Sequence, residues 1–321
     1  MNKKISFRSN FSENIVFISG LSRSGKSLFC PIVSSLNNVE NFHIIPLIEE
    51  ILRLNSLGYI KNDVADYLIK INFNHLIYEN SIGRNFNFRP KDWTSIRNYP
   101  KANLYIKKLN LKDGDVAYKK LLKRNTLSPF MLHDGIIYSK LLLRNFKNVK
   151  ILHIQRHPID IIISWLKKNL ENKKSLLNQR HLSLLFNINN KTIPYHSLRY
   201  YKKYLKLNHL ERIIKTIENI IMSHKKNYQK LSKKQKKQIF FVNFDKFVTN
   251  PNKELKKICK FLKVKKTSAT NLTLKKQRCP RKIELKLRKR NLFKIKKNLT
   301  YNFQKKIEKL IKEYEAQNIK I

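Results

Sequence analysis

The stretch N-I-V-F-I-S-G-L-S-R-S-G-K-S, residues 14–27, decides the fold of this chain. Its first six residues form an apolar run that ends at a glycine, which predicts a short buried strand. The eight residues from Gly20 fit the phosphate-loop pattern G-x-x-x-x-G-K-[ST], and apolar residues then recur at helical spacing from Ser27 to Leu36. A loop between a strand and a helix can wrap an anion with its backbone N–H groups. The stretch therefore predicts an α/β protein with a phosphate site.

The rest of the chain repeats the alternation of strand and helix. Apolar runs at 149–154 and 239–244 predict two more strands, and helices are expected after them at 158–168 and 251–262. We expect further helices at 46–54, 63–78, 197–230 and 301–317, and an irregular segment at 80–103. This order predicts a doubly wound parallel sheet of the P-loop type, flanked by helices and carrying helical insertions. We expect one domain over 1–321, with its core at 14–265 and a basic C-terminal segment at 266–321.

Composition sets limits on the class of protein. The 321 residues are 41% hydrophobic and 11% aromatic, which is enough to build a core and excludes a disordered chain. Cys30, Cys259 and Cys279 are scattered without a C-x-x-C pair, so neither a disulfide framework nor a zinc site is expected. The sequence shows no signal peptide and no transmembrane run. We therefore expect a cytoplasmic protein without a metal.

The charge of the chain is strongly positive. Lys and Arg number 69 and Asp and Glu 21, which gives a formal net charge of +48 and indicates an anionic partner. Abundant Lys, Asn and Ile with scarce Ala and Gly also fit an AT-rich genome, which would explain much of the excess. Lysine-rich runs at 225–237 and 286–297 are the only support for a nucleic-acid-binding protein, because no recognised RNA- or DNA-binding motif accompanies them. We expect no specific nucleic acid partner.

The phosphate loop alone leaves two kinds of enzyme open. Arg23 and Lys26 supply full positive charges, and Ser24 and Ser27 supply hydroxyl donors. A nucleotide kinase or NTPase would also need a carboxylate for Mg²⁺, usually at the end of a neighbouring strand. The predicted strand at 239–244 ends at Asp245, which keeps a kinase that uses Mg-ATP as an alternative.

A second segment indicates another phosphate site. In Arg156-His-Pro158-Ile-Asp160-Ile-Ile-Ile-Ser164, the proline suits the first turn of a helix, so Arg156 lies just before that helix. Ser164 lies about two turns along the helix, on the face that it shares with Asp160. An arginine and a serine placed in this way can converge on one phosphate.

Together these segments resemble the sulfotransferases that use 3′-phosphoadenosine-5′-phosphosulfate (PAPS). The family loop P-[KR]-S-G-T-T corresponds to Ser22–Ser27, and the family motif R-x-P-x-D-x-x-x-S corresponds to Arg156, Pro158, Asp160 and Ser164. A late strand with an acidic turn, a proline and a helix ending in F-L is similar to residues 241–262. The resemblance covers about residues 14–265. It implies sulfuryl transfer from PAPS to a hydroxyl or amine of a small molecule or a glycan, without a metal.

The resemblance also implies roles for single residues. It assigns the 5′-phosphosulfate to the loop and the 3′-phosphate to Arg156 and Ser164, while Arg23 and Lys26 would stabilise charge in the transfer. The loop residues concerned are Ser22, Arg23, Ser24, Gly25, Lys26 and Ser27. The sequence departs from the family at Lys26, where Thr is usual. The family's C-terminal Arg-Lys-Gly element is also not plainly present, and its local candidates are Arg278, Arg281 and Lys282.

The general base is less well defined by the sequence. The family uses Glu or His, often after the first helix, and the residues of these types there are Glu40, His43, Glu49 and Glu50. We favour Glu49, because a carboxylate on the next predicted helix could reach the site. His133-Asp134 is a second acid–base candidate, whereas His153 is expected in the core. The aromatic, Arg-bearing segment at 78–93 is a candidate lining of the acceptor pocket or a surface loop. The acceptor and the oligomeric state stay open.

Overall fold

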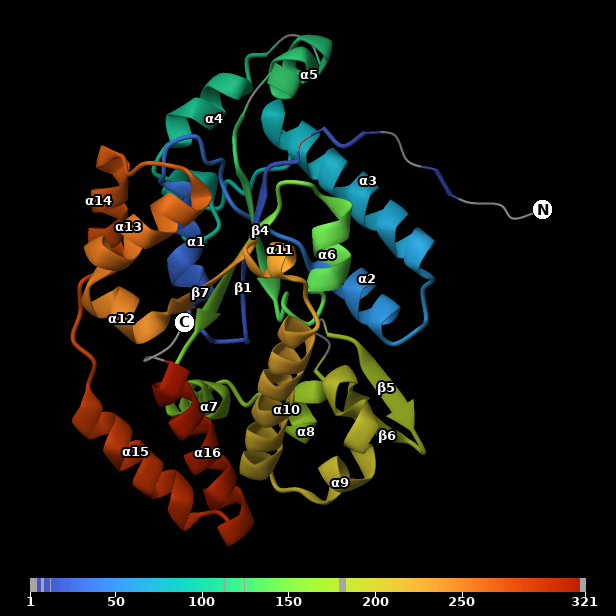
Figure 1. Cartoon of the computed structure of the whole chain (residues 1–321), viewed down its shortest axis with the longest axis vertical. Coiled ribbons are helices and arrows are strands. Elements are labelled where there is room, and N and C mark those ends of the chain that lie inside the picture. The colour runs from blue at the N-terminus through green and yellow to red at the C-terminus, as the bar shows by residue number, and fades with distance from the viewer. Residues whose placement is uncertain are drawn as a thin grey trace.

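The computed structural model describes residues 5–317, apart from 7–8, 12, 112–113, 124 and 179–182. At its centre lies a five-stranded parallel sheet (Figure 1). The strands, in spatial order, are β2 (His43–Ile44), β3 (Ser128–His133), β1 (Ile15–Gly20), β4 (Lys150–Gln155) and β7 (Ile239–Asn243). The three strands predicted from the sequence are confirmed as β1, β4 and β7, and so is the doubly wound parallel arrangement.

The register of the sheet places the phosphate loop at the carboxyl ends of the strands. Gly20, the last residue of β1, pairs with His133 at the end of β3 and with Ile154 near the end of β4. Gln155 in turn pairs with Asn243 at the end of β7. The residues that follow β1, β3, β4 and β7 therefore meet at the carboxyl edge of the sheet. Ligands usually bind at this edge in open α/β sheets.

Helices cover both faces of the sheet (Figure 1). One face carries α1 (Lys26–Ser34), α12 (Phe244–Thr249), α13 (Pro251–Leu262) and α14 (Ser268–Lys276). The other face carries α2 (Pro46–Ser56), α3 (Asn62–Ser81) and α6 (Ser139–Asn145). Successive residues of β1 point to opposite faces, so Ile15 and Phe17 join one apolar cluster while Val16 and Ile18 join the other.

A third apolar cluster lies beyond the carboxyl edge of the sheet. It joins α7 (Pro158–Lys167), α10 (His209–Gln229), α15 (Leu285–Lys297) and α16 (Tyr301–Gln317). Trp165, Ile213 and Phe303 are buried there. The expected C-terminal segment from 266 is thus built of α14, α15 and α16, and it returns to the edge where the phosphate loop lies (Figure 1).

Several elements differ from the sequence predictions. Strand β3 contains Pro129, which disfavours a strand in sequence patterns, and β2 has only two residues. The helix expected over 197–230 is divided into η2 (Tyr195–Tyr200), α9 (Tyr201–Lys206) and α10, because Asn208 starts a new helix through a capping box with Glu211. The remaining elements are η1 (Ile96–Asn98), α4 (Ala102–Lys108), α5 (Gly114–Lys123), α8 (Lys173–Leu176), the antiparallel strands β5 (Leu185–Ile188) and β6 (Lys191–Pro194), and α11 (Lys233–Lys236).

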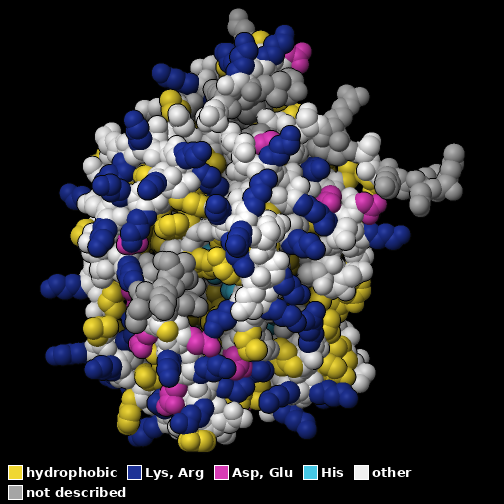
Figure 2. Space-filling view, viewed as in Figure 1, with side chains coloured by type: hydrophobic (Ala, Val, Ile, Leu, Met, Phe, Trp, Pro, Cys, Tyr) yellow, Lys and Arg dark blue, Asp and Glu magenta, His cyan; other side chains and the backbone are white. Residues whose placement is uncertain are grey.

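The positive charge is distributed widely. Figure 2 shows Lys and Arg side chains over the whole of the visible face, with few Asp and Glu between them. A dispersed charge of this kind matches a compositional bias better than a nucleic-acid-binding stripe. Within the described ranges, no helix is both long enough and apolar enough to span a bilayer.

Candidate active site

The phosphate loop between β1 and α1 has a tightly constrained backbone. Arg23 and Gly25 both have positive φ, 67° and 106°, and α1 starts directly after Gly25. A Cβ atom on Gly25 would clash with ring carbons of Phe244, which follows β7. Glycine is therefore required here for two reasons, the left-handed conformation and the contact with Phe244. The first turn of α1 can then approach an anion with its backbone N–H groups.

We expect Gly25→Ala to destabilise the protein by about 1–3 kcal/mol, because it combines backbone strain with a steric clash. Urea or thermal unfolding measures this change. Gly58→Ala is the matched control, since Gly58 also has a positive φ, 84°, but its Cβ would meet nothing within 4 Å. Equal losses in the two variants would contradict the role of the Phe244 contact.

Lys26 lies beneath the loop. Its ammonium donates hydrogen bonds to the carbonyl oxygens of Gly20 and Leu21, at 2.8 and 2.9 Å. The residue is only 4% exposed, although it also lines the large cavity described below. Burial lowers the pKa of Lys26 to about 8, against the opposing effect of Asp134 and Glu49. The fold thus brings the pKa of Lys26 close to neutral pH, so a small rise in pH removes its positive charge.

This pKa predicts a pH dependence of anion binding. Because Lys26 loses its proton as the pH rises through about 8, we expect a pH-dependent affinity for 3′,5′-ADP, the nucleotide that PAPS becomes when it loses its sulfuryl group. The affinity should change little from about pH 7 to 7.5 and fall by up to about tenfold per unit above pH 8. Calorimetric titration at several pH values measures it. Lys26→Arg keeps a charge at high pH and should remove the fall. A flat profile up to pH 9.5 in the unmodified protein would disprove the assignment.

The second phosphate motif is joined to the loop by direct hydrogen bonds. The Nε of Arg23 donates to the Oγ of Ser164 at 2.9 Å, and Arg156 donates to the carbonyl oxygen of Arg23 at 3.0 Å. The indole Nε1 of Trp165 donates to the carbonyl oxygen of Ser22 at 3.0 Å. The structure therefore brings Arg23, Arg156 and Ser164 together, although 133 and 141 residues separate the bonded pairs.

A third arginine from the C-terminal segment reaches the same place. The guanidinium groups of Arg156 and Arg281 lie 4.7 and 5.5 Å from the ring centroid of Phe244. Burial lowers the pKa of Arg156, and the charge of Arg281 lowers it further while Asp160 opposes the shift. Two neighbouring guanidinium groups repel each other, and a bound anion would relieve that repulsion. Of the three local candidates Arg278, Arg281 and Lys282, only Arg281 has this contact among the described interactions.

Arg288 of α15 was missed by the sequence analysis. It lies 2.6 Å from a carboxylate oxygen of Asp160 and 2.9 Å from one of Asp245, so it connects the first turns of α7 and α12 with α15. The only sequence signal for it was the basic run at 286–297. Asp245, the proposed Mg²⁺ ligand of the kinase alternative, is thus an ion-pair partner of an arginine. Within the described ranges, no group of three or more His, Cys, Asp and Glu residues could hold a metal ion.

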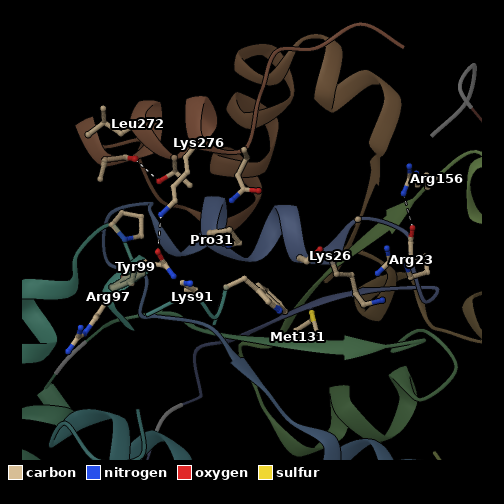
Figure 3. Close-up of a pocket in the computed structure, with 18 of the residues that line it drawn as sticks. Arg23, Lys26, Pro31, Lys91, Arg97, Tyr99, Met131, Arg156, Leu272 and Lys276 are labelled. Atoms are coloured by element: carbon tan, nitrogen blue, oxygen red, sulfur yellow. Dashed lines mark hydrogen bonds between the residues drawn. The ribbon is translucent and has the colours of Figure 1, made fainter. Parts of the chain in front are cut away.

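A large cavity of about 910 Å³ extends from this anion site along α1. Figure 3 shows Arg23, Lys26 and Arg156 at one end and Lys91, Arg97 and Lys276 at the other, with Pro31 of α1 between them. None of the described residues that line it is Asp or Glu. The cations that line it are Arg23, Lys26, Lys91, Arg97, Arg156 and Lys276. A cavity with this lining is suited to a ligand with several negative charges.

Glu49 and His133 form a pair at the border of the large cavity. One carboxylate oxygen of Glu49 accepts a hydrogen bond from the backbone N–H of His133 at 2.8 Å and lies 2.9 Å from its Nδ1. The other oxygen accepts a bond from Arg53 at 2.8 Å. Although burial raises the pKa of Glu49, the hydrogen bond and charge of His133 and the charge of Arg53 lower it below its ordinary value. A carboxylate on Nδ1 favours the tautomer whose Nε2 can accept a proton.

The other candidate bases lie in different environments. Glu50 pairs with Arg53 at the edge of the site, and Glu40 bonds to Tyr105 and Lys108 away from the large cavity. Burial lowers the pKa of His43 to about 4, and this residue lines neither the large cavity nor the small one defined below. His153 is 4% exposed and packs against His224 and Phe241, which confirms its prediction as a core residue.

The segment at 78–93 contributes less to the site than the sequence suggested. Trp93 lines the large cavity and stacks on Phe42, with ring centroids 5.4 Å apart. Phe86 instead packs edge-on against Tyr105 in a small apolar cluster. Lys91 is therefore the polar residue that this segment contributes to the lining of the large cavity, whereas the segment that follows supplies Arg97 and Tyr99.

Comparison with known proteins decides the family. The sulfotransferase domain model matches residues 13–318. The chain belongs to the sulfotransferase family. It is therefore a sulfuryl-transferring enzyme by family, in agreement with the two motifs that meet at the site. A search of proteins with curated functions found no match.

Solved sulfotransferase structures are similar to this chain at low sequence identity. The sulfotransferase domain of the curacin biosynthetic pathway is 12% identical and has a TM-score of 0.50, covering 94% of this chain and 97% of that one. The sulfotransferase domain of the Synechococcus PCC 7002 olefin synthase is 16% identical, with a TM-score of 0.45 and 94% of both chains covered. The sulfotransferase of Alicyclobacillus acidocaldarius is 16% identical, with a TM-score of 0.33, 95% of this chain and 96% of that one covered.

Proposed function

We propose that this sulfotransferase moves a sulfuryl group from PAPS to a hydroxyl or amine of a small-molecule or glycan acceptor. The observation that carries the proposal is the direct contact between the two phosphate motifs, through Arg23, Ser164 and Arg156. A single ligand with anionic groups at two positions, as PAPS has, would engage both motifs at once. The neighbouring guanidinium of Arg281 supports a strongly charged group near Arg156.

The residues of the loop would bind and orient the donor. Bound PAPS supplies the sulfuryl group, with 3′,5′-ADP as the leaving group. Arg23, Lys26 and the backbone N–H groups at the start of α1 would stabilise the negative charge that develops on the leaving phosphate. Arg156, Ser164 and Arg281 would hold the second phosphate. Positioning and electrostatic stabilisation then supply most of the catalysis, and a metal is not needed for these roles.

We assign the general base to His133 and a positioning role to Glu49. His133 lies at the end of β3, beside the loop, and 32% of its side chain is exposed, whereas Glu49 is buried with both oxygens engaged. Nε2 of His133 would take the proton of the acceptor hydroxyl, while the carboxylate of Glu49 holds Nδ1 and stabilises the imidazolium that forms. This assignment revises the choice of Glu49 as the base.

Thermal shift in the presence of nucleotides tests the donor. We expect 3′,5′-ADP at 100 times its Kd to stabilise the protein by about 2.7 kcal/mol without Mg²⁺, and Mg-ATP to have a smaller effect. Stabilisation by Mg-ATP alone would favour the kinase alternative. Transfer of ³⁵S from labelled PAPS to a panel of glycan, lipid and small-molecule acceptors then tests the reaction, and its failure with every acceptor class would count against it.

Two further predictions from the sequence, on cellular location and on nucleic-acid binding, are not part of this reaction. The cytoplasmic location is consistent with the three free cysteines in the described part of the chain. The nucleic-acid alternative would require salt-dependent binding to random RNA, and the dispersed positive charge on the visible face gives it no added support (Figure 2).

A further inference from the structure

A second, smaller cavity of about 290 Å³ opens on the other side of His133. This small cavity shares Ser22 and His133 with the large cavity, so the two meet at the proposed base. Its walls come from α2, from the end of β3, from α7 and the residues after it, and from the junction of β6 and η2. A group bound there would lie next to the position where the proton is removed.

The two cavities have opposite charge. The small cavity has one Lys or Arg among its described lining residues, Arg53, and its carboxylates are Glu49, Glu50, Asp134 and Glu171. The large cavity has six cations and no carboxylate. In a chain with 69 Lys and Arg against 21 Asp and Glu, compositional bias alone would not give an acidic lining. Burial raises the pKa of Asp134, but the hydrogen bond and charge of His224 outweigh it and lower that pKa to about 2. The pKa of Glu49 is also lowered, by His133 and Arg53, so both carboxylates are ionised at neutral pH.

The polar groups of the small cavity can both donate and accept hydrogen bonds. Arg53 bonds to Glu49 and Glu50 and lies 4.8 Å over the ring of Tyr195. The side chain of Arg53 is 8% exposed, and its Nε has no hydrogen-bond partner among the described residues. Of the two carboxylates that pair with Arg53, that of Glu50 is the more accessible, with 29% of its side chain exposed. An N–H donor beside carboxylate acceptors and an aromatic ring is a typical environment for hydroxyl groups.

We propose that the small cavity binds the acceptor and selects a hydroxyl-rich group that is neutral or positively charged, as in a sugar or an amino sugar. Hydroxyl or ammonium groups would donate to Glu50, and a hydroxyl oxygen would accept from Arg53. Acidic groups are rejected because they would lie close to ionised carboxylates in a partly desolvated space. The same repulsion keeps the phosphates of the donor in the large cavity. This inference rests on the proposed function and names the class of its acceptor.

Binding of three related sugars tests the inference. Saturation-transfer NMR with the full chain and 3′,5′-ADP compares the methyl β-glycosides of glucosamine, glucose and glucuronate, which share one ring and differ in charge. We expect the first two to bind and the glucuronate to bind at least about tenfold more weakly, the effect of one charge-assisted contact. Glu50→Gln should weaken glucosamine binding by about three- to tenfold and improve glucuronate binding. Glu284→Gln, at an exposed position before α15, should change neither.

Each result decides for or against the inference. The inference is overturned if glucuronate binds as strongly as glucosamine, or if none of the three sugars binds. It is also overturned if the Glu50→Gln variant binds the three sugars with the same relative affinities as the unmodified protein. Calorimetry with 3′,5′-ADP on the same samples separates this failure from a failure of the proposed function, because donor binding does not depend on Glu50. Circular dichroism confirms that the variant is folded.

Discussion

His133→Ala is expected to lower kcat by about 10²- to 10⁴-fold, the usual contribution of a general base. The reason is geometric, because His133 is the titratable side chain that borders both cavities while its Nδ1 is held 2.9 Å from Glu49. Its removal leaves the acceptor proton without a positioned base, while the phosphate contacts of the loop are unchanged. The affinity for 3′,5′-ADP should therefore stay within about twofold, which calorimetry measures alongside the transfer assay.

Glu49→Gln separates positioning from catalysis at the same site. A glutamine keeps the size of the side chain but removes the negative charge that stabilises the imidazolium, so kcat should fall and the acidic limb of the pH–rate profile should move to lower pH. A merely structural role would lower the thermal stability without moving that limb. Full transfer activity in His133→Ala, together with a complete loss in Glu49→Gln, would return the base to Glu49.

Arg156→Ala is expected to weaken 3′,5′-ADP binding by about 10- to 150-fold, as for the loss of a charge-assisted hydrogen bond to phosphate. Arg156 also donates to the carbonyl oxygen of Arg23, so its loss loosens the loop that binds the other phosphate. Arg156→Lys should recover only part of the affinity, because an ammonium reproduces neither the planar fork nor the stacking on Phe244. Calorimetric titration measures all three proteins.

Arg278→Ala serves as the control for charge. Arg278 is exposed and close in sequence to the site, so its removal lowers the net charge by the same amount without touching either motif. We expect less than a twofold change in its affinity for 3′,5′-ADP. An equal loss in the two variants would mean that overall charge, and not the Arg156 site, governs donor binding.

Local patterns in the sequence predicted much of the framework. The apolar run of β1, the glycines of the loop and the proline at the start of α7 are each visible within a few residues, because strand burial and helix capping depend on near neighbours. Strand β3 was missed because Pro129 interrupts its pattern, yet its neighbours in the sheet supply the hydrogen bonds that stabilise it. The break before α10 was missed because the capping box at Asn208 lies inside a continuous helical pattern.

The sequence by itself determined the class of fold, the phosphate loop and the second phosphate motif, since each is encoded by residues close together in the chain. Only the tertiary structure decided how these parts act together. It placed His133 against Glu49 across 84 residues and Arg288 against Asp160 across 128 residues. Such pairings depend on which strand ends meet at the carboxyl edge of the sheet, and no local pattern records this. The acidic lining of the small cavity arises in the same way, from α2 and from the residues that follow β3 and α7.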